Sequence, residues 1–388
     1  MPTLNLPTAE GDLAPYATGA PRDFADAPRR PFNRLALAAA HVVADPLADV
    51  DPWLTPAVDW DRTIAFRRHL WRLGLGVAEA MDTAQRGGGL DWPTSLELIR
   101  RSVEAAREVP GAVIASGAGT DHLAADGGAT IDDVIAAYEE QCAAVEACGG
   151  RIILMASRAL AACATTPDDY IRVYDRILGQ VAEPVIIHWL GEMFDPALAG
   201  YWGDDDHERA MDTCLAVLER NAAKVDGIKI SLLDKDKEIA MRRRLPDGVR
   251  MYTGDDFNFA ELIAGDDEGY SDALLGIFDA IAPAASAALE ALAGNRPADF
   301  HDILAPTVPL SRHIFRAPTR FYKTGVVLMA YLNGHQDHFV MVGGQESARS
   351  ISHLAELFRL ADKAGLLHDP DMAASRMSRV LSVHGIGA

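Results

Sequence analysis

The chain has 388 residues, of which 49% are hydrophobic and 24% are charged, a balance typical of folded globular proteins. Its 36 Lys and Arg residues against 56 Asp and Glu residues give a formal net charge of −20. Because nucleic acids and anionic membranes are bound through basic surfaces, this charge argues against both as partners.

The cysteines favour a reducing compartment. Cys142, Cys148, Cys163 and Cys214 form no CxxC pair and no zinc-finger spacing, and four cysteines are too few for a disulfide scaffold at this length. The first residues have neither a basic start nor an apolar core, as a secretory signal would. No run approaches the roughly 18 apolar residues of a spanning helix. We therefore expect a soluble cytoplasmic protein.

The order of apolar runs and helical patterns along the chain predicts a barrel. Residues 1–33 show no period and are expected to form an N-terminal arm without regular structure. Apolar runs then alternate with helical patterns such as 95–109, 130–148 and 167–181. Eight apolar runs separated by helices predict a closed (β/α)₈ TIM barrel over residues 34–280. Residues 281–388 show only helical patterns, so a C-terminal helical extension is expected. The eight runs are 35–43, 74–80, 112–119, 151–157, 184–190, 226–233, 249–256 and 269–276.

Lys229 is the most informative polar residue at the expected strand ends. It lies in the apolar run DGIKISLL, where burial of an unpaired ammonium would be costly. Desolvation lowers the pKa of a lysine, which favours attack on a carbonyl carbon and formation of a Schiff base. The alternative is a lysine whose head pairs with Asp226 or Asp255.

Several segments together resemble the dihydrodipicolinate synthase/N-acetylneuraminate lyase family. They are AVIASGAGT (112–120), EPVIIHWL (183–190), KVDGIKIS (224–231) and VRMYTGDD (249–256), followed by a proline-bearing helix. The family carries a lysine on its sixth barrel strand and GDD at the end of the seventh. The resemblance implies a class I aldolase or lyase in which Lys229 condenses with a substrate ketone.

Two departures from the family pattern bear on the substrate and on proton transfer. The family's fourth strand ends in a tyrosine, whereas here Ser157 and Arg158 stand in its place. The loop after the second strand, which holds a carboxylate in the family, here reads AMDTAQRGGG. Asp82 in that loop would repel a pyruvate-like carboxylate, so a neutral polyol or a keto-sugar is expected to fit better. With the tyrosine absent, His188 and Ser157 are the predicted proton-handling residues.

The predicted site has three groups of residues. Lys229, His188 and Ser157 are the catalytic candidates. The substrate-binding candidates are Asp82, Thr83, Gln85, Arg158, Asp255 and Asp256. Arg158 either clamps an acidic substrate group or pairs with Asp168 or Asp169 outside the site, and Asp255 and Asp256 are either ligand-facing groups or strand-end caps.

Two alternatives remain open. Glu79, Asp82, His188, Glu192 and Asp255 all fall at strand ends and are of types that bind a divalent metal, as in metal-dependent aldolases and sugar isomerases or epimerases. A non-catalytic ligand-binding barrel is the other alternative. The charge-rich helix at 235–244 is expected to be a solvated face.

The favoured interpretation is a Schiff-base-forming lyase or aldolase acting on a keto-acid or keto-sugar, in carbohydrate metabolism. It requires no cofactor, and its partner is a small-molecule substrate. By analogy with related barrels, a homodimer or homotetramer is expected.

Overall fold

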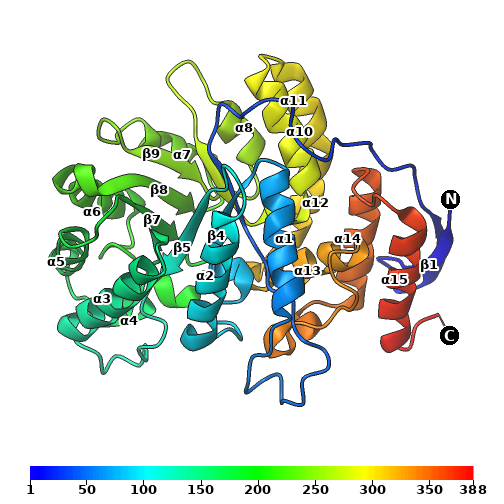
Figure 1. Ribbon diagram of the computed structural model, residues 1–388, viewed down its shortest axis with the longest axis horizontal. Coiled ribbons are helices and arrows are strands. Elements are labelled where there is room, and N and C mark those ends of the chain that lie inside the picture. The colour runs from blue at the N-terminus through cyan, green and yellow to red at the C-terminus, as the bar shows by residue number, and fades with distance from the viewer. Residues whose placement is uncertain (388) are drawn as a thin grey trace.

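The computed structural model describes residues 1–387 and contains an eight-stranded barrel with a group of helices at one side (Figure 1). The barrel strands are all parallel, and the sheet closes in the order β10-β3-β4-β5-β6-β7-β8-β9. Each predicted apolar run overlaps one strand, so the predicted TIM barrel is confirmed. The strands are β3 (Ala36–Ala39), β4 (Gly76–Glu79), β5 (Ile114–Ala118), β6 (Arg151–Leu154), β7 (Val185–Leu190), β8 (Val225–Ser231), β9 (Arg250–Thr253) and β10 (Asp272–Leu275).

Helices follow each strand and cover the outside of the barrel. Their starts carry the expected signals: the Thr130 hydroxyl and the Asp133 carboxylate cap α3 reciprocally, and Pro167 opens α5. The helices are α1 (Trp60–Arg72), α2 (Trp92–Arg107), α3 (Ile131–Ala147), α4 (Arg158–Cys163), α5 (Pro167–Leu178), α6 (His207–Arg220), α7 (Lys235–Arg242), α8 (Phe259–Ala264), α9 (Ile277–Ala280) and α10 (Ala282–Ala293).

The barrel interior is a small apolar core of its own. It is built from Leu37, Ala78, Ile153, Ile186 and Leu274, with further residues of the same strands. Because side chains alternate along a strand, the residues between these point outward to the helices. The interior core fills the barrel below its carboxyl-terminal end, which leaves that end for polar side chains.

The C-terminal region contains helices and no strand among the described residues, as expected. Helix α13 lies among the other helices of this region and also contacts η1 (Asp82–Ala84), the short 3₁₀ turn that follows β4. The C-terminal region therefore reaches the carboxyl end of the barrel. The remaining helices are α11 (Pro297–Leu304), α12 (Val308–Ile314), α13 (Tyr322–Leu332), α14 (Ile351–Lys363) and α15 (Pro370–Val383).

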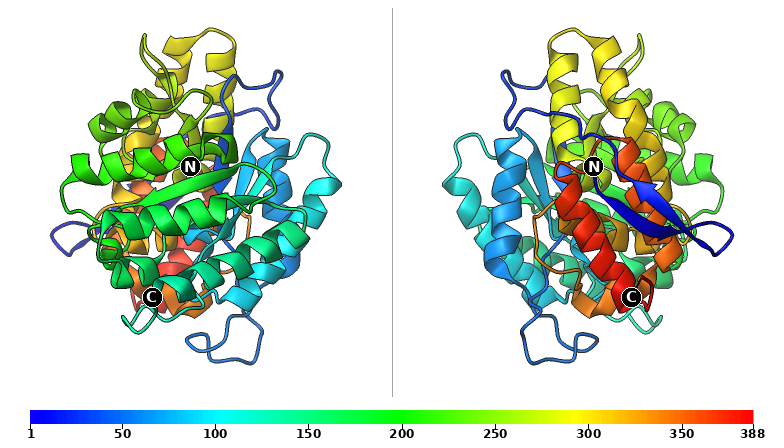
Figure 2. Two further views of the ribbon diagram at one scale, coloured as in Figure 1. Left: turned by 90° about the vertical axis from the view of Figure 1, so that its left-hand side faces the viewer. Right: turned by 90° about the vertical axis from the view of Figure 1, so that its right-hand side faces the viewer.

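The N-terminal arm contains regular structure that the sequence analysis did not predict. Strands β1 (Thr3–Pro7) and β2 (Leu13–Ala17) form an antiparallel hairpin that packs on α14 and α15 (Figure 2). Leu4 and Leu6 point into the core, and the Tyr16 hydroxyl donates a 2.7 Å hydrogen bond to Asp362. The alternating pattern is only five residues long and ends in proline, which is too short to stand out in the sequence.

Candidate active site

Lys229 lies inside the barrel near the carboxyl end of β8. Its Cα pairs with that of His188 on β7 and with that of Tyr252 on β9. Only 7% of the residue is exposed. Burial lowers the pKa of its amine, and the carboxylates of Asp82 and Asp256 offset part of that effect. Lys229 is therefore buried, as predicted.

The glycine of the Gly-Asp-Asp segment makes room for the lysine stem. A Cβ at Gly254 would lie 2.7 Å from Lys229 Cε and 2.2 Å from Ser231 Oγ. Both separations are far below ordinary van der Waals contact. Any side chain at position 254 would therefore displace the lysine.

Asp256 is a buried carboxyl group whose charge partly offsets the lowering of the Lys229 pKa by burial. Its Oδ1 accepts a 2.8 Å hydrogen bond from the backbone N–H of Ile277 at the start of α9. Burial raises the pKa of Asp256 to about 7, although the neighbouring Lys229 lowers it in part. A carboxyl group with this pKa can give or take a proton near neutral pH.

The two carboxylates named as alternative partners of Lys229 have other roles. Asp226 accepts a 2.5 Å hydrogen bond from the Tyr252 hydroxyl. Asp255 accepts backbone N–H bonds from Phe257 and Asn258 at 2.8 and 3.0 Å, so it caps the turn after β9. Of the two neighbouring acids, Asp256 rather than Asp255 raises the pKa of Lys229 through its charge, and Asp255 caps the turn; a substrate-binding role for Asp255 stays a prediction.

His188 is buried beside Lys229 and lines a cavity of about 240 Å³ at the mouth of the barrel. Its Nε2 lies 3.1 Å from Ser231 Oγ, while Nδ1 has no hydrogen-bond partner among the described residues. Burial, together with the charge of Lys229, holds its pKa well below the ordinary value. His188 is therefore a neutral imidazole with a free ring nitrogen.

The cavity beside His188 is lined by polar side chains, both positively and negatively charged. Asp82, Arg86, Thr120 and Arg158 contribute to its lining. Arg86 binds Asp121 through both Nε and Nη2, and Arg158 forms an ion pair with Asp195. The suggested alternative pairing of Arg158 with Asp168 or Asp169 is wrong, since its ion-pair partner is Asp195 at the cavity wall.

Ser157 is buried next to this cavity, but its hydroxyl is already engaged. It caps α4 by accepting a 2.9 Å hydrogen bond from the Leu160 N–H. It also lies 2.6 Å from the Thr120 hydroxyl, which lines the cavity. Any part that Ser157 takes in proton transfer therefore runs through Thr120.

The loop after β4 divides into a site-facing part and a structural part. Asp82 lines the cavity, and the Thr83 hydroxyl lies 2.8 Å from the Tyr322 hydroxyl. Gln85 instead donates from Nε2 to the Val342 carbonyl at 2.5 Å. Gln85 was predicted to bind substrate, and the structure shows it anchoring the loop to the C-terminal region.

Tyr322 and Lys323, at the start of α13, were not among the predicted site residues. Tyr322 is buried, and burial raises the pKa of its phenol well above the ordinary value, so it keeps its proton. Burial lowers the pKa of Lys323, with Asp82 offsetting part of that effect. Both residues are far from the barrel strands in sequence, and no local motif marks them.

The residues of the metal alternative are not gathered into one site. Glu79 is fully buried and binds Arg67 through both oxygens at 2.8 Å. Asp255 caps a turn, as described above. Among residues 1–387 no cluster of three or more His, Cys, Asp or Glu side chains has an arrangement that suits a metal ion.

Solved structures of similar fold come from the dihydrodipicolinate synthase family. YagE from Escherichia coli K12, a member of that family solved with pyruvate, matches with a TM-score of 0.67 at 13% identity and covers 86% of this chain and 99% of its own. The dihydrodipicolinate synthase of Aquifex aeolicus matches with a TM-score of 0.64 at 13% identity, covering 86% and 98%. The Acinetobacter baumannii enzyme, solved with pyruvate, matches at 0.63 and 16% identity, covering 86% and 99%. The predicted resemblance is confirmed at the level of fold.

A protein-family model matches this chain, whereas no curated protein does. Among the described residues, no helix has both the length and the apolar character needed to cross a bilayer. The model of the family described as "Protein of unknown function (DUF993)" matches residues 4–386. The chain therefore belongs to the DUF993 family, and its barrel has the fold of the dihydrodipicolinate synthase structures.

Proposed function

We propose that this protein is a Schiff-base-forming lyase or aldolase in which Lys229 is the nucleophile. The observation that carries the proposal is a buried lysine on the sixth barrel strand, beside the buried His188 in the sheet, whose pKa is lowered by burial and raised in part by the charge of Asp256. Perturbed titratable groups of this kind cluster at catalytic sites. The fold likeness to dihydrodipicolinate synthase structures supports the same class of reaction.

In the first step the neutral Lys229 amine attacks the ketone carbon of the substrate, and a carbinolamine forms. Asp256 takes up the proton that leaves the nitrogen, since its raised pKa suits that exchange. Asp256 returns this proton to the oxygen, which becomes the carbinolamine hydroxyl. A second proton, drawn from solvent and relayed by the Tyr322 phenol through the Thr83 hydroxyl at 2.8 Å, lets that hydroxyl leave as water and yields a protonated imine.

In the second step the bond between the α-carbon and the β-carbon of the imine breaks. His188 removes the proton of the hydroxyl on the β-carbon, and its unpartnered Nδ1 supports this assignment. The electron pair of the broken bond moves into the protonated imine and produces an enamine and a free aldehyde. Protonation of the enamine carbon and hydrolysis by water then release the ketone and restore Lys229. Ser157 acts, in this proposal, only as a relay through Thr120.

The cavity favours a substrate that carries hydroxyl groups. Asp82 accepts hydrogen bonds from hydroxyls but repels a carboxylate at the same place. Arg158, beside Asp195, adds positive charge to the cavity lining, where an acidic end of a longer substrate would lie. We therefore propose a keto-sugar, or a keto-acid with a polyhydroxylated chain, in preference to pyruvate alone. A homodimer or homotetramer remains a prediction, which light scattering on the purified chain tests.

Borohydride trapping tests the proposal. The protein is incubated with pyruvate, dihydroxyacetone or a 2-keto-3-deoxy sugar acid, reduced with borohydride and weighed intact. Reduction converts an imine into a stable secondary amine, so we expect a mass gain equal to the ligand minus one oxygen. Lys229→Met is expected to show no gain. Absence of a gain with every ligand, or an undiminished gain in Lys229→Met, contradicts the proposal.

A further inference from the structure

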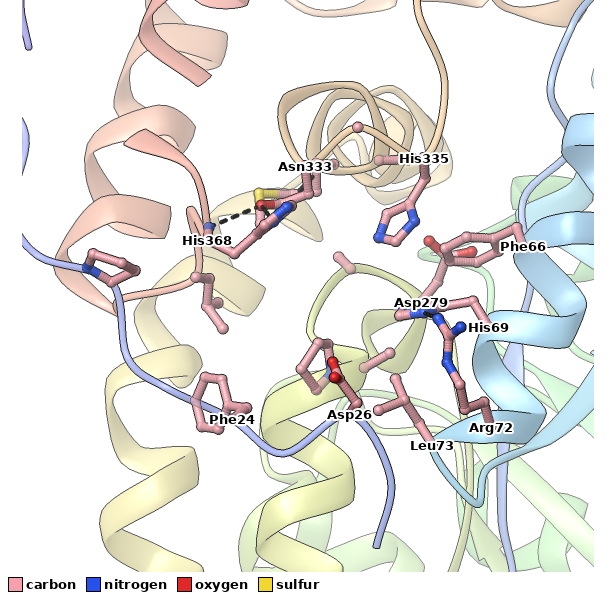
Figure 3. Close-up of a pocket in the computed structure, with 18 of the residues that line it drawn as sticks. Phe24, Asp26, Phe66, His69, Arg72, Leu73, Asp279, Asn333, His335 and His368 are labelled. Carbon is pink, nitrogen blue, oxygen red and sulfur yellow. Dashed lines mark hydrogen bonds between the residues drawn. The ribbon is translucent and has the colours of Figure 1, made fainter. Parts of the chain in front are cut away.

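A second, larger cavity lies outside the barrel. It has a volume of about 860 Å³ and lies between α1, α9, α10 and the end of α13, with the N-terminal segment 21–26 along one side (Figure 3). It shares no lining residue with the cavity beside His188. Volumes of this size are typical of sites for small organic ligands.

Asp279 presents an unsatisfied buried oxygen at the wall of this cavity. Its side chain is 1% exposed. Its Oδ2 accepts hydrogen bonds from the His41 backbone N–H at 2.7 Å and pairs with His41 Nδ1 at 2.8 Å. Its Oδ1 has no hydrogen-bond partner among the described residues. Because a buried carboxylate oxygen without a partner is costly, this atom points to a hydrogen-bond donor supplied from outside the chain.

Two neutral histidines stand next to Asp279 (Figure 3). The His69 and His335 rings are 4.5 Å apart. Arg72 donates to His69 Nδ1 at 3.0 Å, so the His69 proton is on Nε2, which has no partner among the described residues. Burial lowers the pKa of His69 to about 4 and that of His335 to about 3. Both rings are therefore uncharged at neutral pH and offer donor and acceptor nitrogens.

The opposite side of the cavity combines polar and apolar surface. His368 Nδ1 donates to Asn333 Oδ1 at 2.9 Å, which leaves His368 Nε2 as an acceptor. Phe24 and Leu73 contribute apolar surface between the polar ends. A ligand here meets hydrogen-bonding groups at both ends and carbon surface along its sides.

The charges around the cavity balance. Its lining holds three arginines, Arg22, Arg62 and Arg72, and three aspartates, Asp23, Asp26 and Asp279. An anionic ligand would meet the buried Asp279, and a cationic ligand would meet the arginines. An apolar ligand would leave the buried polar atoms unsatisfied. An uncharged molecule with many hydroxyls suits the cavity best, because each hydroxyl both donates and accepts.

We propose that this cavity is a binding site for a neutral polyhydroxylated molecule, a sugar or a polyol, distinct from the lysine site. Its hydroxyls would bond to Asp279, His69 and His335, and its C–H faces would pack on Phe66 and Phe24. Lys229 takes no part in this site, so the proposal stands independently of the lyase function.

Calorimetric titration of the full chain tests the site with ligands that cannot form an imine. The probes are myo-inositol, sorbitol, sucrose and methyl glucoside, all without a free carbonyl, with glucose 6-phosphate and glucosamine as charged comparators. The Lys229→Met background removes any contribution of the lysine. At least one neutral probe is expected to bind saturably and more tightly than the charged comparators.

Two tryptophan variants locate the binding. Ala65 is exposed on α1 and lines the cavity, so Ala65→Trp fills it from the surface. Ala143→Trp makes the same exchange at an exposed position of α3 outside the cavity. We expect binding at least tenfold weaker in Ala65→Trp, a change of about 1.4 kcal/mol, and unchanged binding in Ala143→Trp. Thermal melts confirm that both fold. Failure of all four neutral probes to bind at millimolar concentration, tighter binding of a charged comparator, or equal affinity in the two variants overturns the proposal.

Discussion

The hydroxyls of Tyr322 and Thr83 lie 2.8 Å apart although 239 residues separate them in the sequence. Thr83 follows the second barrel strand, and Tyr322 begins a helix of the C-terminal region. A Cβ at Gly276 would lie 3.3 Å from Thr83 Oγ1 and 3.2 Å from the Tyr322 ring, so the glycine after β10 permits this contact. The C-terminal region thereby contributes a phenol to the mouth of the barrel, where the fourth strand has none.

Tyr322→Phe tests whether this phenol supplies the proton that lets water leave. Removing the hydroxyl is expected to slow imine formation by about 100-fold, the lower end of the range for general acid–base catalysis. The rate of borohydride-trapped adduct formation measures it. Tyr331→Phe, the same exchange on α13 at a buried position, is the control and should leave the rate unchanged. Equal rates for wild type and Tyr322→Phe would remove the tyrosine from the mechanism.

His188→Gln separates the two steps of the proposed reaction. Glutamine fills similar space but cannot accept a proton from the substrate hydroxyl, so carbon–carbon cleavage should fall by about 100-fold or more. Imine formation should continue, because His188 has no role in that step. Product release and adduct mass are measured on the same samples. Loss of the adduct together with the cleavage would show that His188 instead supports Lys229.

Glu79→Gln tests the structural role of a residue first considered as a metal ligand. Glu79 and Arg67 form a fully buried bidentate pair. Neutralising one partner leaves an uncompensated buried charge, so we expect a loss of about 3 kcal/mol or more in the free energy of unfolding. Urea unfolding measures it, with the partly exposed Glu97→Gln on α2 expected to change stability by about 1 kcal/mol or less. A near-neutral Glu79→Gln that abolishes stabilisation by added divalent metal would favour the metal alternative.

Glu238 predicts a specific dependence of stability on pH. It is 1% exposed, and burial raises its pKa from 4.5 to about 8. The folded chain therefore holds a proton that the unfolded chain loses, and its stability falls as pH rises from about 4.5 to 8. Glu238→Gln removes this dependence. The stability of the variant relative to the wild type should therefore rise progressively between pH 5 and 8. Thermal melts across that range measure the gain.

The matched control for Glu238 is Glu261→Gln, an exposed residue of α8 paired with Lys235. It should show the pH dependence of the wild type. A Glu238→Gln variant that follows the wild type at every pH would contradict the burial argument. The sequence predicted a solvated face for residues 235–244, but Glu238 turns inward and its Oε1 accepts a 2.6 Å hydrogen bond from Ser271.

The barrel was predictable because its signal is repeated and local. Each strand is a short apolar run, and each helix carries its own start signals, as Thr130 and Pro167 illustrate. The burial of Lys229 was predictable for the same reason, since a charged residue inside an apolar run contrasts with its neighbours. The hairpin in the arm was missed because its alternating pattern is only five residues long.

The site was only partly predictable, because its partners come from distant segments. Nothing near Tyr322 or Gln85 in the sequence indicates that one contacts Thr83 and the other the Val342 carbonyl. Asp255 and Asp256 are adjacent and chemically identical, yet one caps a turn and the other faces Lys229. Only the direction of each side chain separates these roles, and sequence type does not encode it.

The most direct test of the central claim is the position of the trapped adduct. Lys229 and Lys323 are both lysines whose pKa is lowered by burial and offset by Asp82, so they compete as nucleophiles at the barrel mouth. Peptide mapping of the borohydride-reduced complex by tandem mass spectrometry distinguishes them. The account predicts the adduct on Lys229 in the wild type and in Lys323→Met. An adduct on Lys323, or on neither lysine, would contradict it.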